Sequence, residues 1–338
     1  MVSAFSLACS ACGKCCNSPP SMALPELFRH RDRFVGCIAI GRVTRRRAGE
    51  RVTFGAHYHV LDDADVAAFD TLADALLHRS PLLADQSFSI ATQGFDYPSL
   101  ACCPALADDG LCAIHTNGKP SLCEAVPLDP MVPDSMQHVV LAARNASSAY
   151  FGANCIREGE AVQHGEGCEG TATASNDAHV RVHIVTLVAN GRVQDASAQE
   201  AVQRRRAQLA LDREFWGRTV FELLRGELFD SPVALARIPA DGYLTISLVP
   251  ALLAVARYSD ACRVECVAYI DSQLALIERN VKHALQRRRP DDRPVTRELR
   301  AFADAYAHAK DLLAHPPRMS DNTAPSAARR VESWLRAR

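Results

Sequence analysis

The spacing of apolar residues differs between the two halves of the chain. Beyond about residue 178, long segments carry an apolar stripe along one helical face, which predicts amphipathic helices. We expect these helices over residues 198–229, 248–256, 264–288 and 295–314. In the first half the predicted elements are shorter, and Pro, Gly and Ser interrupt them. The pattern therefore predicts a helical second half and an irregular first half.

A few short elements are expected between the loops of the first half. Apolar spacing predicts a short helix over 21–34, a strand over 35–41, a strand at 57–59, a helix over 65–77, and a strand or helix start over 179–188. His57 and His59 alternate on one strand face and could ligate a metal. Lone histidine pairs are more often surface or core residues, so we prefer that interpretation.

The composition is that of an ordinary globular protein. The chain has 338 residues, 48% of them apolar and 23% charged. A net charge of −1 gives no general attraction to nucleic acid or anionic lipid. No apolar run approaches the roughly 20 residues of a membrane-spanning helix, and the N-terminus lacks the regions of a signal peptide. We therefore expect a cytoplasmic protein that binds neither nucleic acid nor membranes.

The cysteines carry the clearest chemical signal. Thirteen cysteines in a reducing compartment favour metal or cluster ligation over disulfides. Four of them are spaced C-x-x-C-x-x-C-C near the N-terminus: Cys9, Cys12, Cys15 and Cys16. A C-x-x-C turn places two sulfurs on one side of a tight loop, close enough for a metal ion or one face of a cluster. Gly13 relaxes this backbone, and Lys14 favours thiolates by its charge. Adjacent Cys15 and Cys16 could form a disulfide with each other only in a strained ring.

A second group of cysteines follows around a predicted turn. Asp109-Gly110 is a turn signal, and a hairpin there would bring Cys103 and Cys112 to the same end. Prolines on both sides fix the loop that carries Cys123. These three cysteines make a second candidate ligand set on irregular backbone.

The remaining cysteines differ in their surroundings. Cys168 lies in a segment that matches G-x-G-x-x-G, but no clear strand precedes it and no βαβ pattern surrounds it, which excludes a dinucleotide site. Its flanking glycines instead fit a loop close to a cluster. Cys37 lies in a predicted strand, and Cys262 and Cys266 share a helical face; we expect all three to be core thiols.

Together these motifs resemble the CxxCxxCC family, described as zinc- or iron-chelating proteins. The matching stretches are Cys9-x-x-Cys12-Gly-x-Cys15-Cys16, Cys103-Pro-x-Leu-x-x-Asp-x-x-Cys112-x-Ile-His, Lys119-Pro-x-x-Cys123-x-x-x-Pro127 and Gly167-Cys168-x-Gly170. They cover roughly the first half of the chain, with an insertion at about residues 35–100. The family includes the flagellin lysine N-methylase, which carries an iron–sulfur cluster and methylates lysines of flagellin.

The resemblance implies a set of eight ligating thiols: Cys9, Cys12, Cys15, Cys16, Cys103, Cys112, Cys123 and Cys168. Cys102 and Cys155 are spare candidates. All-sulfur sites suit zinc and iron–sulfur clusters alike by ligand type. The C-x-x-C-x-x-C run and the cluster of the related methylase favour [4Fe–4S], with zinc as the alternative.

Three activities follow from this interpretation. The first is a protein lysine N-methylase-like enzyme that uses S-adenosylmethionine on a flagellin-like protein substrate, as the resemblance implies. Lysine methylation needs a nearby base, for which Glu124, His115 and Glu169 are candidates. The second is an iron–sulfur redox or electron-transfer protein, and the third is a non-catalytic structural zinc module.

The predicted fold class is mainly α, with an irregular Cys-rich metal- or cluster-binding domain and a minor α+β part. We expect the Cys-rich domain over residues 1–175, an α-helical domain over 176–316 and a flexible tail over 317–338.

Overall fold

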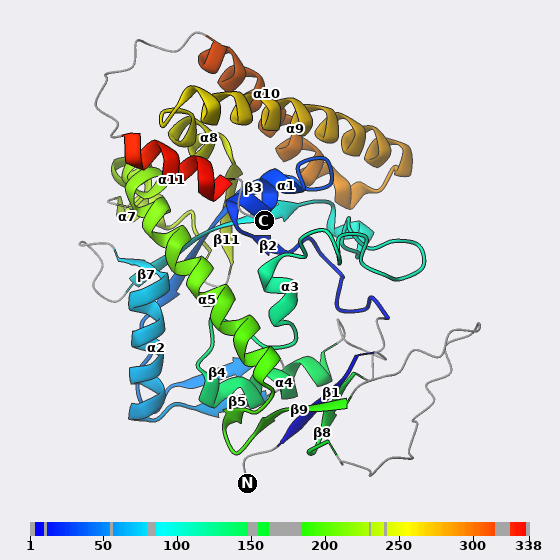
Figure 1. Cartoon of the computed structure of the whole chain (residues 1–338), viewed down its shortest axis with the longest axis vertical. Coiled ribbons are helices and arrows are strands. Elements are labelled where there is room, and N and C mark those ends of the chain that lie inside the picture. The colour runs from blue at the N-terminus through cyan, green and yellow to red at the C-terminus, as the bar shows by residue number, and fades with distance from the viewer. Residues whose placement is uncertain are drawn as a thin grey trace. The chain divides into compact units, whose positions relative to one another are not determined.

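The apolar segments of the sequence form both sheets and helices in the computed structural model of the chain (Figure 1). The structure describes residues 4–9, 12–54, 57–79, 86–147, 155–161, 184–229, 231–239, 242–314 and 325–335. The chain divides into two units, each drawn from three separate stretches of sequence. The first unit comprises Met1–Asn17, Arg45–Ala75 and Ala105–Ala207, and the second comprises Ser18–Thr44, Leu76–Pro104 and Gln208–Arg338.

A four-stranded antiparallel sheet organises the first unit, in the order β10-β9-β1-β8. Its strands are β1 (Phe5–Ala8), β8 (Ile156–Glu158), β9 (Ile184–Ala189) and β10 (Arg192–Val193). β1 is an inner strand, because Leu7 pairs with Ile156 on one side and with Val185 on the other. Phe5 joins an apolar cluster with Leu128, Leu141, Ile156, Leu187 and Val188. This cluster is the hydrophobic core of the sheet. Burial of each of its large apolar side chains contributes about 1.5–3 kcal/mol to folding stability.

A hairpin and three α-helices are further described elements of the first unit. The hairpin pairs β4 (Arg51–Phe54) with β5 (His57–Val60), and the helices are α2 (Asp63–Leu76), α3 (Ser121–Ala125) and α4 (Gln137–Ala146). A second apolar cluster joins the hairpin to α4 and contains Val52, Leu61, Val132, Met136 and Val140. The predicted strand at 57–59 and the predicted helix over 65–77 are both confirmed.

The second unit contains a five-stranded antiparallel sheet. Its strands follow the order β11-β3-β7-β2, with β6 also paired to β7. The strands are β2 (Ser21–Met22), β3 (Val35–Thr44), β6 (His78–Arg79), β7 (Gln86–Phe95) and β11 (Tyr243–Ser247). Residues 35–40 of β3 are all buried, which explains the unbroken apolar run that predicted this strand.

The predicted helix over residues 21–34 is shorter in the structure. Ser21–Met22 pairs with β7, and α1 extends only over Leu24–Arg29. The Ser21 hydroxyl donates to the Thr92 carbonyl at 3.1 Å, and the Thr92 hydroxyl donates to the Met22 carbonyl at 2.5 Å. Pairing with a distant strand therefore withdraws the first residues of this segment from the helix.

Helices make up most of the described chain beyond residue 195. They are α5 (Ala196–Trp216), α6 (Glu222–Leu224), α7 (Pro232–Leu235), α8 (Val249–Ala256), α9 (Asp260–Arg287), α10 (Arg293–Ala314) and α11 (Pro325–Leu335), with π-helical turns at Gly217–Phe221 and Arg225–Phe229. α5 begins in the first unit and ends in the second. α9 and α10 lie side by side as an antiparallel pair (Figure 1). The four long helical regions predicted from apolar spacing are confirmed.

One buried amide joins α9 to the sheet of the second unit. The Gln273 side-chain carbonyl accepts from the Gly36 amide at 2.7 Å. Its side-chain NH₂ donates to the carbonyls of Arg31 and Phe34 at 2.8 and 3.1 Å. Because Gln273 is fully buried, these bonds satisfy groups that would otherwise lack a partner, and they fix α9 against β3.

The predicted fold class is wrong. The chain is not mainly α: its described residues form helices and antiparallel sheets of four, five and two strands. Nor is the first unit an irregular domain held by metal, because its sheet and two apolar clusters organise it. Among the described residues, no group of three or more His, Cys, Asp or Glu side chains could hold a metal ion. The sequence concealed this sheet because its strands are short and pair across large sequence separations.

The predicted domain limit near residue 175 lies outside the described residues. The two units interleave along the chain, and the stretch at about 35–100 supplies parts of both. Within the expected tail, Pro325–Leu335 forms α11.

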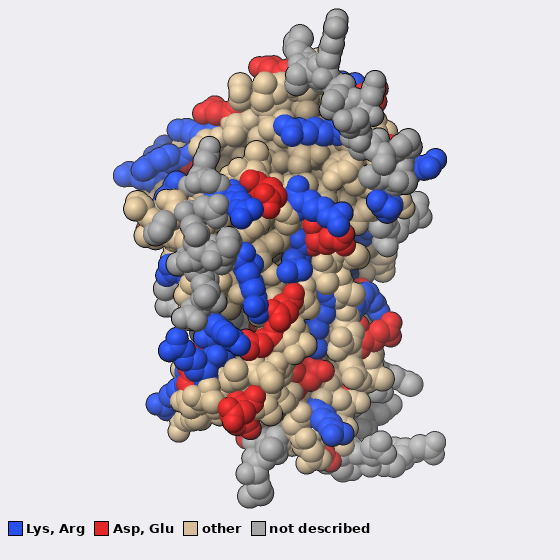
Figure 2. Space-filling view, turned by 90° about the vertical axis from the view of Figure 1, so that its left-hand side faces the viewer, with Lys and Arg blue, Asp and Glu red and all other residues tan. Residues whose placement is uncertain are grey.

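The surface agrees with the near-neutral composition. Lys and Arg side chains lie interspersed with Asp and Glu over the face drawn in Figure 2. In the described part of the chain, no helix combines the length and apolar character that crossing a membrane requires.

Candidate functional site

Two of the cysteine-bearing segments are joined by the sheet of the first unit. β1 ends at Ala8, and Cys9 follows it directly. The Ala8 amide donates to the Cys155 carbonyl at 2.7 Å, which continues the pairing of β1 with β8. The backbone at Cys155 therefore lies beside the exit of β1 toward Cys9.

The rest of the N-terminal cysteine run packs against the turn that carries Cys112. Gly13 has φ +69°, and a Cβ built on it would lie 2.8 Å from both the Gly110 carbonyl oxygen and Leu106 Cδ1. The Cys16 amide donates to the Gly13 carbonyl at 2.9 Å and closes this turn. Only glycine combines that φ with such close backbone approach. Gly13 thus lets the cysteine run reach the second cysteine block.

Cys112 and Cys123 lie on two further anchored segments. The predicted turn at Asp109-Gly110 is present, and an isolated antiparallel bridge pairs Leu106 with Cys112. Cys123 lies on α3, where its amide donates to the Pro120 carbonyl at 2.8 Å. Ala125 of the same helix joins the apolar cluster that also holds β1 and β8. One hydrophobic core therefore positions the segments of Cys9, Cys123 and Cys155.

The surroundings of Cys15 favour its thiolate. A hydrogen bond with Cys16 has the largest effect and, with the charges of Lys119 and Arg144, it lowers the pKa of the Cys15 thiol to about 6. Partial burial opposes this shift. A thiol with such a pKa is mostly ionised at neutral pH, and the thiolate is the form that binds metals and acts as a nucleophile.

Cys155 experiences the opposite effect. Burial raises the pKa of its thiol, and the negative charges of Cys12, Cys15 and Cys9 raise it further. Cys155 thus interacts electrostatically with three thiols of the N-terminal run. From the sequence, Cys155 was only a spare candidate ligand. The hydrogen bond between its carbonyl and β1 joins distant segments, so no local sequence pattern predicts it.

The predicted ligands fall into three groups. The first unit holds six of them, on the anchored loops described above: Cys9, Cys12, Cys15, Cys16, Cys112 and Cys123. Cys103 is buried and belongs to the second unit, as does the exposed Cys102. Cys168 lies outside the described residues. The three cysteines expected in the core are confirmed there: Cys37, Cys262 and Cys266 are each at most 1% exposed.

Comparisons with known proteins add no assignment. No protein-family model, no curated protein and no solved structure matches the chain. The resemblance to the CxxCxxCC family therefore depends on the sequence motifs alone.

The donor chemistry of the first unit fits a thiophilic metal. Four segments supply thiols, and two cations favour the ionised form of one of them. Thiolates are the usual ligands of structural zinc and of iron–sulfur clusters. Across the ranges that the structure describes, however, these side chains do not converge as a ligand group.

The candidate bases offer little support for proton transfer. Glu124 forms an ion pair with Arg204, with 2.7 Å between Oε2 and the guanidinium nitrogen. His115 is exposed, and Glu169 lies outside the described residues. Glu124 is engaged by a guanidinium and His115 faces solvent, so the structure singles out neither of them as a general base.

His59 of β5 has a partner other than the cysteines. His59 Nε2 lies 2.7 Å from Asp65 Oδ2, and the His59 ring lies 6.0 Å from that of His138. The Ser135 hydroxyl donates to the other oxygen of Asp65 at 3.4 Å. Burial is the main cause that lowers the pKa of His138. These contacts agree with the structural interpretation of this histidine.

Proposed function

We propose that the first unit binds a thiophilic metal centre through the cysteines of its N-terminal run and second cysteine block. A [4Fe–4S] cluster is our first choice and zinc the alternative, on the ligand types and the C-x-x-C spacing. The observation that carries this proposal is the anchoring of the cysteine loops. Gly13 presses the run onto the Gly110 turn, and the sheet holds Cys9 beside Cys155. An ordinary core would not need so many thiols on exposed or half-buried loops.

Each part of the unit has a definite role in this proposal. The thiols of Cys9, Cys12, Cys15, Cys16, Cys112 and Cys123 would supply the ligands. Lys119 and Arg144 would favour the thiolate form at Cys15. A bound cluster would supply one-electron chemistry, and zinc would supply a structural or Lewis-acid centre. Cys103 and Cys168 remain predicted ligands from the resemblance.

A purely structural zinc module is the less favoured form of this proposal. Domains that need zinc to fold usually lack a core that could hold them together without it. The first unit buries two apolar clusters under its strands and helices. A metal centre at the exposed loops would therefore add a function to a unit that folds without it.

The methylase-like activity remains a prediction from the resemblance. It implies S-adenosylmethionine as methyl donor and a flagellin-like protein as substrate. Glu124 is ion-paired and His115 is exposed, so we assign no catalytic residue. A redox or electron-transfer role needs no such base, since the cluster itself would carry the electron.

The deciding experiment is anaerobic purification followed by an optical spectrum and analysis of iron, sulfide and zinc. We expect matched iron and sulfide with broad thiolate-to-iron absorption. The Cys12→Ser and Cys15→Ser variants should lose most of the bound metal. The Cys262→Ala variant removes a buried thiol of α9 in the second unit and serves as the control that keeps it. Full-chain protein without iron or zinc, or equal metal content in all three variants, would overturn the proposal.

A further inference from the structure

Helix α9 carries apolar side chains on a solvent-facing side. Leu274, Val281 and Leu285 are spaced seven and four residues apart, so they lie along one face of the helix. Leu274 and Val281 are half-buried, and Leu285 is 56% exposed. A row of partly exposed apolar side chains on a charged surface is typical of an interaction site.

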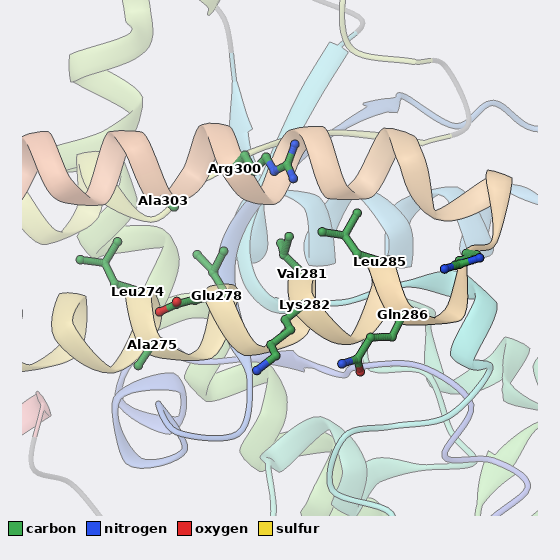
Figure 3. A pocket seen from close by; sticks show the side chains of 11 residues that line it. Leu274, Ala275, Glu278, Val281, Lys282, Leu285, Gln286, Arg300 and Ala303 are labelled. Carbon is green, nitrogen blue, oxygen red and sulfur yellow. The ribbon is translucent and has the colours of Figure 1, made fainter.

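These side chains border a groove between α9 and α10 of the second unit. The groove has a volume of about 1060 Å³, and Ile277 lies at its buried base. Figure 3 shows Leu274, Val281 and Leu285 pointing from α9 toward α10. On the α10 side the small residue Ala303 lines the groove. A methyl group opposite leucine and valine leaves the hollow that a larger side chain would fill.

The border of the groove is positively charged. Lys282, Arg288 and Arg300 line it against a single acid, Glu278. All four side chains are exposed. In the described part of the chain, none of the three cations takes part in an ion pair. An apolar base with cations on its edges complements a ligand that is apolar on one face and acidic on its flanks.

We propose that this groove binds an amphipathic helix with acidic flanks from another protein. Its apolar side chains would pack on Leu274, Val281 and Leu285, and its carboxylates would pair with Lys282, Arg288 and Arg300. An α-helix rises ~1.5 Å per residue, so the stretch from Leu274 to Leu285 spans about 17 Å, or about three turns of a bound helix. Laying an amphipathic helix in an apolar groove is a recurrent mode of peptide recognition. This surface is independent of the thiols of the first unit.

Other occupants fit the groove less well. The chain's own α11 carries Arg329 and Arg330, which the cations of the groove would repel. It also contacts the opposite end of α9, where the Ser259 hydroxyl donates to Glu332 at 2.5 Å. A lipid surface would place acyl chains against Glu278, within the apolar row, and leave its carboxylate without a hydrogen-bond donor. A helix can place a polar side chain there.

A direct test measures binding of a designed peptide to the full chain by fluorescence anisotropy. The probe is a stapled, fluorescein-labelled helix of about 15 residues, long enough to cover the groove. It has leucines at i, i+4 and i+7 and glutamates on both flanks. We expect saturable binding that weakens about tenfold or more for each of Leu285→Gln and Arg300→Glu. Arg297→Glu reverses an exposed charge on α10 outside the groove and should bind the probe as the parent chain does.

The controls separate the proposal from its competitors. A peptide with lysines in place of the glutamates, and one with the leucines scattered around the helix, should bind at least tenfold more weakly. Circular dichroism of each variant checks that the helices are intact. Equal binding of the three peptides, or equal affinity of parent, Leu285→Gln and Arg300→Glu chains, would overturn the proposal. A concentration-dependent dimer that Leu285→Gln abolishes would also overturn it, because the occupant would then be a second copy of the chain.

Discussion

Cysteine has two different roles among the single residues of this chain, and burial separates them. Burial raises the pKa of the Cys37 thiol to about 12 and keeps it a neutral core group. The pKa of the Cys15 thiol is instead lowered to about 6 by its hydrogen bond with Cys16 and by nearby cations. The two residues are chemically identical, so their surroundings alone decide which of them is a ligand or nucleophile.

The ionisation of Cys15 can be measured in metal-free protein. Because its thiol has a pKa of about 6, iodoacetamide should modify Cys15 at half its maximal rate near pH 6 and at a constant rate above pH 7. Lys119→Gln should raise that midpoint, and Lys282→Gln in the second unit should leave it unchanged. Peptide mapping by mass spectrometry follows each cysteine separately. A Cys15 rate that still rises above pH 8 would contradict the assignment.

His78 provides a second test at this scale. Burial, with a smaller contribution from Arg213, lowers the pKa of its imidazole to about 4. Between that value and 6.5 only the unfolded chain takes up the proton, so folding stability should fall as pH drops through this window. The full loss is about 3 kcal/mol below pH 4.

Urea denaturation at a series of pH values from 7.5 to 4 measures this loss. His78→Phe should flatten the dependence while preserving the stacking on Phe221, whose ring lies 5.0 Å from that of His78. His283→Gln, at an exposed position on α9, is the matched control and should keep the slope. The interpretation fails if His78→Phe and the parent chain lose stability equally.

At the scale of elements, short strands and one turn decide where the cysteines lie. β1 has only four residues, yet it pairs on both edges and carries Cys9 at its exit. The turn at Gly13 then brings the run onto the Gly110 turn. A substitution in β1 or in the turn at Gly13 removes no thiol. The position of the cysteine loops can therefore be tested separately from the ligands themselves.

Gly13→Ala should disturb the site without removing a thiol. The new Cβ would meet the Gly110 oxygen and Leu106 at 2.8 Å, and φ +69° is unfavourable for alanine by about 1–2 kcal/mol. Gly49→Ala is the matched control, since Gly49 has φ +80° but a Cβ added there would meet nothing within 4 Å. Both variants should lose similar backbone stability, and only Gly13→Ala should lose metal. Metal analysis and Cys15 alkylation give the readout; full metal content in Gly13→Ala would refute the role of this turn.

At the scale of the whole molecule, each unit has its own sheet and its own buried apolar side chains. The core of the first unit draws on β1, α3, α4, β8, β9 and α5, which come from distant parts of the sequence. Such long-range packing gives the unit a source of stability that does not depend on its cysteines. We therefore expect the proposed metal centre to be dispensable for folding of the first unit.

Metal removal should therefore leave the first unit folded. After chelation, we expect amide hydrogens of β1, β8 and β9 to keep their protection in hydrogen-exchange mass spectrometry. Leu187→Ala, by contrast, removes a side chain that is 1% exposed and should cost about 2–5 kcal/mol. If chelation exposes these strands as Leu187→Ala does, the metal is structural, as in a zinc module.

The sequence by itself determined the long helices, the buried strand β3 and the core positions of Cys37, Cys262 and Cys266. Periodic apolar residues and unbroken apolar runs are local signals, so they can be interpreted without knowledge of the fold. The unusual thiol spacing likewise marked the N-terminal run. Tertiary structure alone decided that β1 pairs with β8 and β9, that Cys155 lies beside the exit toward Cys9, and that Lys119 and Arg144 act on Cys15. These features depend on pairing between distant segments, whose free energy comes from burial that no short stretch of sequence contains.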